Sequence, residues 1–365
     1  MRSVKKFFCA GLILTFMCMC TGCPGAMSRG EPDRLGSWGS INQDITRGED
    51  WQQIVTDSAF PIGRKMLLTD PYGEQYHEIS FGNYPRLDGS TVAVPMAIEF
   101  ARQHLGLSDQ DAADFVSFST THAAYERLIY KYGGHGDYNP MGAPMNTKHP
   151  VDLIIATAPS EDERKMARET NTELVQVPVC WDAFVFITHR DNPVSSLTQE
   201  QIRGIYSGEI TSWEEVGGRK QKIAAYQREE NSGSQTAMLE LVMRDTPMLP
   251  PEKIVAVEGM SGMIELVAEY QNSTASIGYT YKYYIDTLYK NEDIKILAVD
   301  GVEPTVENIR SQAYPYSTQY YGVIREADMD KTGGAFLQWM LSPEGQACIR
   351  QAGYIPCAEG QEKTQ

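Results

Sequence analysis

The sequence has little positive charge, little histidine and none of the common catalytic motifs. Lysine and arginine number 32 against 48 aspartates and glutamates, which gives a formal net charge of −16. Nucleic acids and anionic lipid surfaces are bound through cationic side chains that displace counterions, so this balance argues against both as partners. There is no G-x-S-x-G elbow, H-E-x-x-H pair or P-loop. The sequence therefore gives no reason to expect an enzyme.

The six histidines are scattered, and one grouping alone has residue types that bind metal ions. His122 and Glu126 have helical spacing, and His135 and His149 follow in a Gly- and Pro-rich stretch. Isolated histidines near such loops are usually solvated, so we predict no metal site and no cofactor. With 42% hydrophobic and 22% charged residues, the 365-residue chain is otherwise an ordinary globular sequence with room for two cores.

The N-terminus has the order of regions that is typical of a signal peptide. Basic residues precede an apolar run from Phe7 to Cys20, which is too short to span a bilayer. The run ends in Thr21-Gly22-Cys23, which resembles the lipobox of bacterial lipoproteins, although Cys20 stands where leucine is usual. The resemblance implies that residues 1–22 are removed and that Cys23 carries a lipid anchor. The alternative is an ordinary signal peptide with a chance cysteine at its end.

Three further cysteines lie in the rest of the chain. Cys180 stands in the apolar stretch 177–181, which is typical of core packing and not of a nucleophile. Cys348 and Cys357 are close enough in sequence to form a disulfide in an oxidising compartment.

From residue 77 onward, short apolar segments alternate with amphipathic ones, which predicts an α/β fold with mostly parallel strands and helices on the sheet faces. Residues 23–76 are predicted to be a tether and the segment that leads into the folded part of the chain. The predicted strands are 78–81, 114–118, 151–156, 184–187, 223–226, 254–257, 275–279 and 320–324. The predicted helices are 93–104, 123–131, 160–169, 198–206, 236–243, 261–270 and 334–341.

The helices and strands form two similar sets, and the end of the chain is predicted to return to the first set. This pattern predicts two lobes that are connected by two segments of the chain. Lobe 1 comprises 77–183 with 318–365, and lobe 2 comprises 184–317. Ligands bind beyond strand ends at such junctions, so we expect a site between the lobes.

One segment combines the groups that recognise a tetrahedral oxyanion. A predicted strand is followed by Arg228 and then by Ser232-Gly233-Ser234 at the start of a helix. The arginine offers paired donors, the hydroxyls donate without adding charge, and the glycine lets the backbone approach the anion. The alternative is that a serine merely caps the helix and that Arg228 pairs with Glu230 at the surface.

Two other predicted helix starts have the same composition. Ser90 and Thr91 follow Gly89 after one strand, and the hydroxyl-bearing stretch 119–121 precedes a second helix. Each of them alone would be interpreted as a helix cap. Three such helix starts, in both lobes, favour a shared binding site.

The stretch Tyr206-Ser-Gly-Glu-Ile-Thr-Ser-Trp213, followed by the Arg228 segment, closely resembles the phosphate-binding proteins of ABC phosphate importers. The resemblance extends over about 77–356 and includes Asp88-Gly-Ser-Thr91 and Ser276-Ile-Gly-Tyr279. It implies a two-lobed periplasmic-binding-protein fold of type II that closes on a ligand in the interlobe cleft.

The resemblance also implies which residues contact the anion. In lobe 1 they are Ser90 or Thr91, the backbone amide of Val92, and one of Ser119, Thr120 and Thr121. In lobe 2 they are Arg228, Ser232, Gly233 and Ser234, with Glu230 where the family has an acidic residue.

Thr157 stands where the family commonly has an aspartate just before Ala-Pro. A carboxylate there accepts the proton of monohydrogen phosphate and repels a fully ionised anion, whereas a hydroxyl can donate and accept. The sequence therefore predicts weaker discrimination between oxyanions, or discrimination by Glu230 instead.

These expectations describe an exported, monomeric, lipid-anchored binding protein on the outer face of the cytoplasmic membrane. It would capture phosphate or a related oxyanion and deliver it to an ABC permease. The alternatives are a sensor or surface-binding protein with the same fold, or a secreted hydrolase. The tyrosines around 279–284 and 314–321 indicate strand and hinge packing, with carbohydrate stacking as the alternative.

Overall fold

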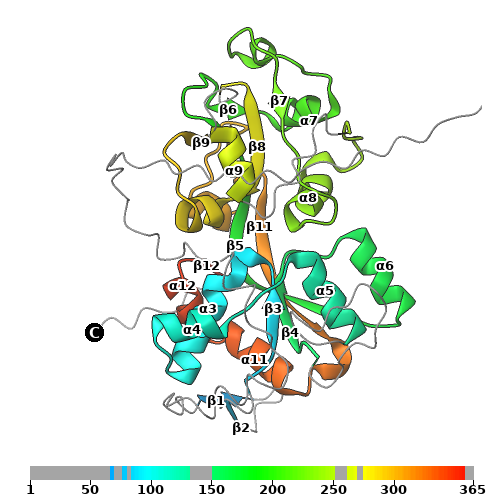
Figure 1. The fold of residues 1–365 in the computed structure, drawn as a ribbon, viewed down its shortest axis with the longest axis vertical. Helices are drawn as coiled ribbons and strands as arrows, with labels where there is room; N and C mark the ends of the chain where they lie inside the picture. The colour runs from blue at the N-terminus through cyan, green and yellow to red at the C-terminus, as the bar shows by residue number, and fades with distance from the viewer. Residues whose placement is uncertain are drawn as a thin grey trace, which may run out of the picture. The chain divides into compact units, whose positions relative to one another are not determined.

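The computed structural model describes residues 66–69, 76–79, 84–131, 150–250, 261–268 and 274–357. The predicted signal peptide, Cys23, the first part of the tether, His135, His149 and the predicted strand 254–257 lie outside these residues. The described chain alternates between helices and strands, which confirms the α/β class (Figure 1).

The strands and helices of the described chain have the following bounds. The strands are β1 Met66–Thr69, β2 Tyr76–Ile79, β3 Leu87–Gly89, β4 Leu153–Ala156, β5 Leu174–His189, β6 Ser196–Leu197, β7 Ala224–Ala225, β8 Ser276–Tyr281, β9 Ile294–Ile296, β10 Ala298–Val299, β11 Ser317–Arg325 and β12 Ile355–Pro356. The α-helices are α3 Val94–Leu105, α4 Asp109–Phe115, α5 Thr121–Tyr130, α6 Glu161–Glu169, α7 Gln199–Ser207, α8 Gly233–Ala237, α9 Ser261–Ala268, α10 Val306–Arg310, α11 Thr332–Leu341 and α12 Pro343–Gln351. Short 3₁₀ or π segments are η1 Thr91–Ala93, η2 Trp213–Val216, η3 Met238–Met243, η4 Tyr284–Leu288 and η5 Glu326–Asp328.

The larger strands form one hydrogen-bonded path in the order β3-β4-β11-β5-β8-β7, with β9 and β12 also paired to β5. The pairing is mixed. β3 pairs in parallel with β4, and β7 with β8. β11 is antiparallel to β4 and β5, and β5 is antiparallel to β8 and β9.

Strand β5 belongs to both halves of this path. Up to Ala183 it pairs with β11, where Ala183 lies opposite Ser317, and from Phe184 onward it pairs with β8. β5 and β11 run side by side through this junction (Figure 1). The pairing partner of β5 therefore changes between Ala183 and Phe184, and the predicted lobe boundary lies at the same place.

A buried carboxyl group lies at the crossing. Oδ1 of Asp182 accepts hydrogen bonds from the backbone N–H groups of Ala183, at 2.7 Å, and Tyr283, at 3.1 Å. Burial raises the pKa of Asp182 to about 7. The Tyr283 ring also stacks on that of Tyr354, with 3.7 Å between ring centres. These contacts fix the first residues after β8 against the C-terminal part of lobe 1.

The tyrosine-rich segments are part of the core. Tyr279, Tyr314 and Tyr320 have no exposed surface, and Tyr281 and Tyr316 are almost fully buried. Their rings pack against one another and against phenylalanines of β5, with centre-to-centre distances between 5.4 and 6.4 Å. This packing agrees with the structural interpretation of these residues, since buried rings cannot stack on a sugar.

Two sequence predictions about local structure are wrong. The predicted strand 114–118 begins inside a helix, because Ser108 caps α4 by accepting from the Asp111 N–H at 3.2 Å. The chain becomes extended only at Val116. The helix predicted from residue 236 begins earlier, at Gly233, and continues from Met238 as a π-helix.

In this structure Cys348 and Cys357 are free thiols, and the disulfide between them stays a prediction. β12 pairs with β5 so that Pro356 lies opposite Cys180, which places Cys357 beside the buried Cys180. Burial raises the pKa of Cys348 to about 12 and that of Cys357 to about 11.

Candidate functional site

The first candidate loop follows β3. A Cβ atom on Gly89 would lie 2.1 Å from the carbonyl oxygen of Ile155, so only glycine lets β3 end this close to β4. The next residue, Ser90, donates its N–H to the same carbonyl at 2.9 Å. Ser90 is buried and stands at the start of η1, but its side chain makes no capping hydrogen bond. Its hydroxyl is therefore not used as a helix cap.

The other two residues of this loop differ in exposure. Thr91 is half-buried, whereas Val92 is fully buried and its carbonyl accepts a hydrogen bond from the Tyr354 hydroxyl. Tyr354 follows α12 near the end of the described chain. The loop is therefore held between β4 and the C-terminal segment.

Asp88, which the sequence analysis did not select, anchors this loop to the start of α5. Its buried carboxylate accepts from the Ser119 N–H at 2.6 Å, from the Ser119 hydroxyl at 2.9 Å and from the Arg127 guanidinium at 2.6 Å. The Ser119 hydroxyl is thus directed to Asp88. No local pattern could have indicated this, because Arg127 lies 39 residues further along the chain.

The three hydroxyls of the stretch 119–121 have different roles. Thr120 is exposed and caps α5, since its side chain accepts from the Ala123 N–H at 3.4 Å. Thr121 is buried at the first position of α5. It is the member of this stretch that lies next to lobe 2, as the contacts of Gly233 show.

Thr157 follows β4 and is buried. Its hydroxyl lies close to the hydroxyl of Tyr281 and has no other partner among the described residues. Its backbone is fixed, because the carbonyl of Thr157 accepts from the Tyr125 hydroxyl at 2.7 Å. A buried hydroxyl on a fixed backbone, with a single hydroxyl neighbour, can still donate a hydrogen bond to an anion.

Gly233 brings the two lobes together at this point. A Cβ atom on Gly233 would lie 2.8 Å from Oγ1 of Thr121 and 3.0 Å from Oγ1 of Thr157. The Gly233 carbonyl accepts from the Tyr281 hydroxyl at 3.1 Å, which ties the start of α8 to β8. Two hydroxyls of lobe 1 therefore adjoin the first turn of a lobe 2 helix.

Of the two serines beside Gly233, one caps a helix and the other is buried, as is true of Thr120 and Thr121 at α5. Ser232 is the N-cap of α8 and accepts from the Gln235 N–H at 3.2 Å, as the capping alternative predicts. Ser234 is buried in the first turn of α8.

Arg228 is a buried cation, with 7% of its surface exposed. Its N–H donates to the Tyr279 hydroxyl at 2.9 Å and to Oε1 of Gln235 at 3.2 Å, which fixes it relative to β8 and α8. Burial lowers the pKa of its guanidinium. Glu230 is exposed, and the neighbouring carboxylate is that of Glu229 at 3.6 Å. The role predicted for Glu230 stays a prediction.

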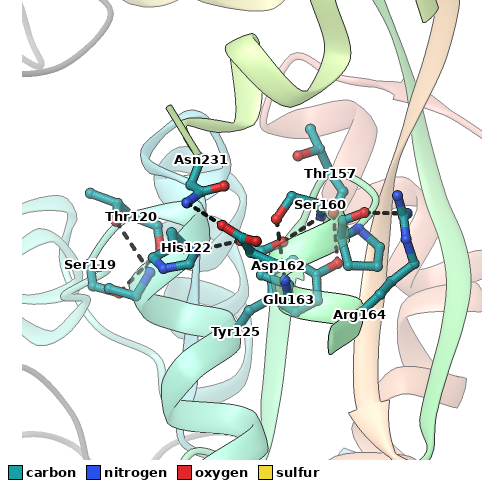
Figure 2. Close-up of polar contacts among 12 residues, drawn as sticks. Ser119, Thr120, His122, Tyr125, Thr157, Ser160, Asp162, Glu163, Arg164 and Asn231 are labelled. Atoms are coloured by element: carbon teal, nitrogen blue, oxygen red, sulfur yellow. Dashed lines mark hydrogen bonds and ion pairs between the residues drawn. The ribbon is translucent and has the colours of Figure 1, made fainter. Parts of the chain in front are cut away.

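A polar cluster on α6 lies beside these loops (Figure 2). The buried Glu163 carboxylate contacts Nδ1 of His122 at 3.0 Å and accepts from the Ser160 N–H at 2.7 Å. Lobe 2 reaches the same helix, because Nδ2 of Asn231 donates to Asp162 at 3.0 Å.

A second polar contact joins the lobes at α6, since Arg164 pairs with Glu240 on η3. In the part of the chain that the structure describes, no group of three or more His, Cys, Asp or Glu residues is arranged to hold a metal ion. Over the same residues, no helix has the length and apolar character needed to cross a membrane.

The arrangement can neutralise and hydrogen-bond a small oxyanion. A desolvated arginine supplies the charge, and hydroxyl and helix-start N–H groups from both lobes supply donors at fixed positions. The described site residues do not include a nucleophile paired with a base, which acyl or glycosyl transfer would need.

Comparison with protein families identifies the class. Residues 131–344, more than half of the chain, match the family model of a PBP superfamily domain. The chain therefore belongs to the PBP superfamily, and its α/β two-lobed fold is the one expected from the sequence resemblance.

Similar proteins give a narrower comparison. The phosphate-binding protein PstS of Borreliella burgdorferi is 27% identical over 226 residues, covering 61% of this chain and 78% of the relative. PstS of Staphylococcus aureus is 23% identical over 287 residues, covering 76% and 80%. A putative phosphate ABC transporter substrate-binding protein from Clostridium perfringens, solved with bound phosphate, has a TM-score of 0.53 and 26% identity, covering 74% of this chain and 98% of that one.

We expect Gly233→Ala to weaken anion binding by keeping the lobes apart. The new methyl group would lie within 3.0 Å of the Thr121 and Thr157 hydroxyls, so one of them or α8 has to move. Calorimetry with phosphate should show at least a tenfold loss of affinity, about 1.4 kcal/mol. Thermal unfolding without anion should be unchanged or improved, because alanine favours a helix start over glycine. Equal affinities in variant and parent would contradict the contact between lobes.

Proposed function

We propose that the protein is an extracytoplasmic solute-binding protein that captures phosphate or a related oxyanion between its two lobes. The observation that carries this proposal is the meeting of the Thr121 and Thr157 hydroxyls with Gly233, close in sequence to the buried Arg228. The names of its relatives support phosphate as the ligand, and one similar structure contains phosphate. The protein would act by binding and would not be a catalyst.

The proposed binding set draws on both lobes. The guanidinium of Arg228 carries the countercharge, and its removal from water strengthens its attraction for an anion. Hydroxyls and backbone N–H groups provide the remaining donors without adding charge. The set comprises Ser90, Thr91, Val92, Thr121, Thr157, Arg228, Ser232, Gly233 and Ser234. Ser119 and Thr120 support the lobe 1 loops instead, through Asp88 and the cap of α5.

Closure of the lobes would complete the site, and opening would release the anion to a membrane permease of the ABC type. The Asn231–Asp162 and Arg164–Glu240 contacts support this step, because they join residues of lobe 2 to α6 of lobe 1. Both contacts are polar and near the surface, so water can replace them when the lobes separate.

The location proposed for the protein is the outer face of the cytoplasmic membrane. Its support is the signal-peptide pattern and the Thr21-Gly22-Cys23 sequence. Lipid on Cys23 would keep the binding protein near the permease while the folded part stays in water. A single copy of the chain carries all the residues of the proposed site, which is compatible with a monomer.

Calorimetry of the chain from Pro24 onward with phosphate, sulfate and molybdate at pH 6 and pH 8 tests the function. We expect saturable heat with phosphate at both values. We also expect measurable sulfate binding, because the Thr157 hydroxyl can donate to a fully ionised oxygen where a carboxylate would repel it. Absence of phosphate binding at both pH values would overturn the proposed function.

Arg228→Ala should reduce phosphate affinity by more than a hundredfold. The variant loses charged donors in a buried site, which corresponds to about 3 kcal/mol or more. Arg219→Ala is the matched control, since Arg219 is an exposed arginine of the same lobe. Equal affinities for the parent, Arg228→Ala and Arg219→Ala would show that the anion binds elsewhere.

Cys23→Ser should release the full-length protein from membranes. In cells fed radiolabelled palmitate, the parent chain should be labelled and fractionate with membranes, and the variant should be unlabelled and soluble. Cys9→Ser is the control, because Cys9 lies in the segment that cleavage removes and outside the lipobox-like residues. Labelling of the Cys23→Ser variant would contradict this site of lipidation.

A further inference from the structure

We infer that His122 is a positioning residue that makes anion binding by this site depend on pH, an inference that rests on the proposed function. His122 is the second residue of α5 and directly follows Thr121, one of the hydroxyls that meet Gly233. Its side chain is 32% exposed, so it can exchange protons with solvent.

The contact of His122 joins two of the lobe 1 loops. Nδ1 of His122 lies 3.0 Å from Oε1 of Glu163, and the other oxygen of Glu163 accepts from the Ser160 N–H at 2.7 Å. Ser160 also caps α6 by accepting from the Glu163 N–H at 3.3 Å. The Thr157 hydroxyl is on the loop that ends at Ser160. One buried carboxylate therefore holds the start of α5 and the Thr157 loop together.

The charges around His122 favour its protonated form. The hydrogen bond that the His122 ring donates to the Glu163 carboxylate raises the pKa of His122 above its usual value, and the negative charges of Glu126 and Asp162 act in the same direction. Glu126 comes from α5 and the other two come from α6. From lobe 2, the uncharged amide of Asn231 binds Asp162. Burial of the ring opposes these effects but does not outweigh them.

Protonated His122 affects the binding of an anion at the neighbouring Thr121. Positive charge at a helix N-terminus is disfavoured by the helix dipole, unless negative charge lies nearby. Glu163 provides that charge on one side, and an anion at Thr121 would provide it on the other. When His122 loses its proton, the charge of Glu163 is left uncompensated and repels the anion. Affinity should therefore fall as pH rises through the raised pKa of His122.

The linkage between proton binding and anion binding gives the size of the pH effect on affinity. If anion binding raises the pKa of His122 by about one unit, the anion binds about tenfold more tightly to the protonated protein than to the neutral one. The same coupling predicts that phosphate raises the pKa of His122 when it binds.

The test is calorimetry with inorganic phosphate from pH 5.5 to 9 on the parent, His122→Gln and Glu163→Gln. Phosphate itself ionises in this range, so the measured quantity is the ratio of Kd between variant and parent at each pH. For His122→Gln we expect a ratio of about ten at low pH that approaches one at high pH. Glu163→Gln should move the midpoint of the parent's pH dependence to lower pH, because the imidazole loses its carboxylate partner.

Lys165→Gln is the matched control, since it removes a positive charge from an exposed position of α6. Its ratio should be constant with pH. A constant ratio for His122→Gln, in a protein that binds phosphate, overturns this inference alone. No phosphate binding by the parent at any pH overturns the proposed function, and this inference with it. If His122→Gln does not fold, the pKa of His122 in the parent can be measured by NMR titration with and without phosphate. A pKa that phosphate does not raise overturns the inference.

Discussion

The arrangement of the site depends on one strand that belongs to two sheets. β5 is 16 residues long, and its first part pairs with β11 while its last part pairs with β8. A hydrogen-bonded strand has little freedom to bend, so in the proposed mechanism the hinge lies at the residues where the partners change. At that point Asp182 binds the backbone of Tyr283 through a carboxylate oxygen. The loops at the strand ends on either side are therefore held facing one another.

The two lobes contribute different chemistry to the site. In lobe 1 the nearby charges are paired, Arg127 with Asp88 and His122 with Glu163, so this lobe offers mainly neutral hydroxyls. Lobe 2 contributes Arg228, which lies 3.6 Å from the half-exposed carboxylate of Glu229. One desolvated cation can bind an anion although the whole chain has a net charge of −16, because salt screens the distant charges within about 10 Å. The net charge therefore disfavours binding of large polyanions but does not prevent binding of a small anion at this site.

Local patterns in the sequence were sufficient for much of this structure. The caps at Ser160 and Thr198 and the helix that begins beside Ser232 follow from neighbouring residues, and the strand–loop–helix segment around Arg228 could be recognised for the same reason. The contacts that sequence patterns could not indicate join distant residues. Asp88 binds Ser119 and Arg127 through the tertiary fold, and Cys357 lies beside Cys180 because β12 pairs with β5. The strand predicted at 114–118 failed because a cap at Ser108 outweighed its apolar residues.

The contacts between the lobes indicate where the free energy of closure has to come from. Asn231 binds Asp162, and Arg164 pairs with Glu240, whose side chains are 40% and 35% exposed. Polar pairs with this exposure contribute about 1 kcal/mol or less each, too little to hold two lobes together against the entropy of opening. In the proposed mechanism, bonds to the anion therefore supply most of the closing free energy.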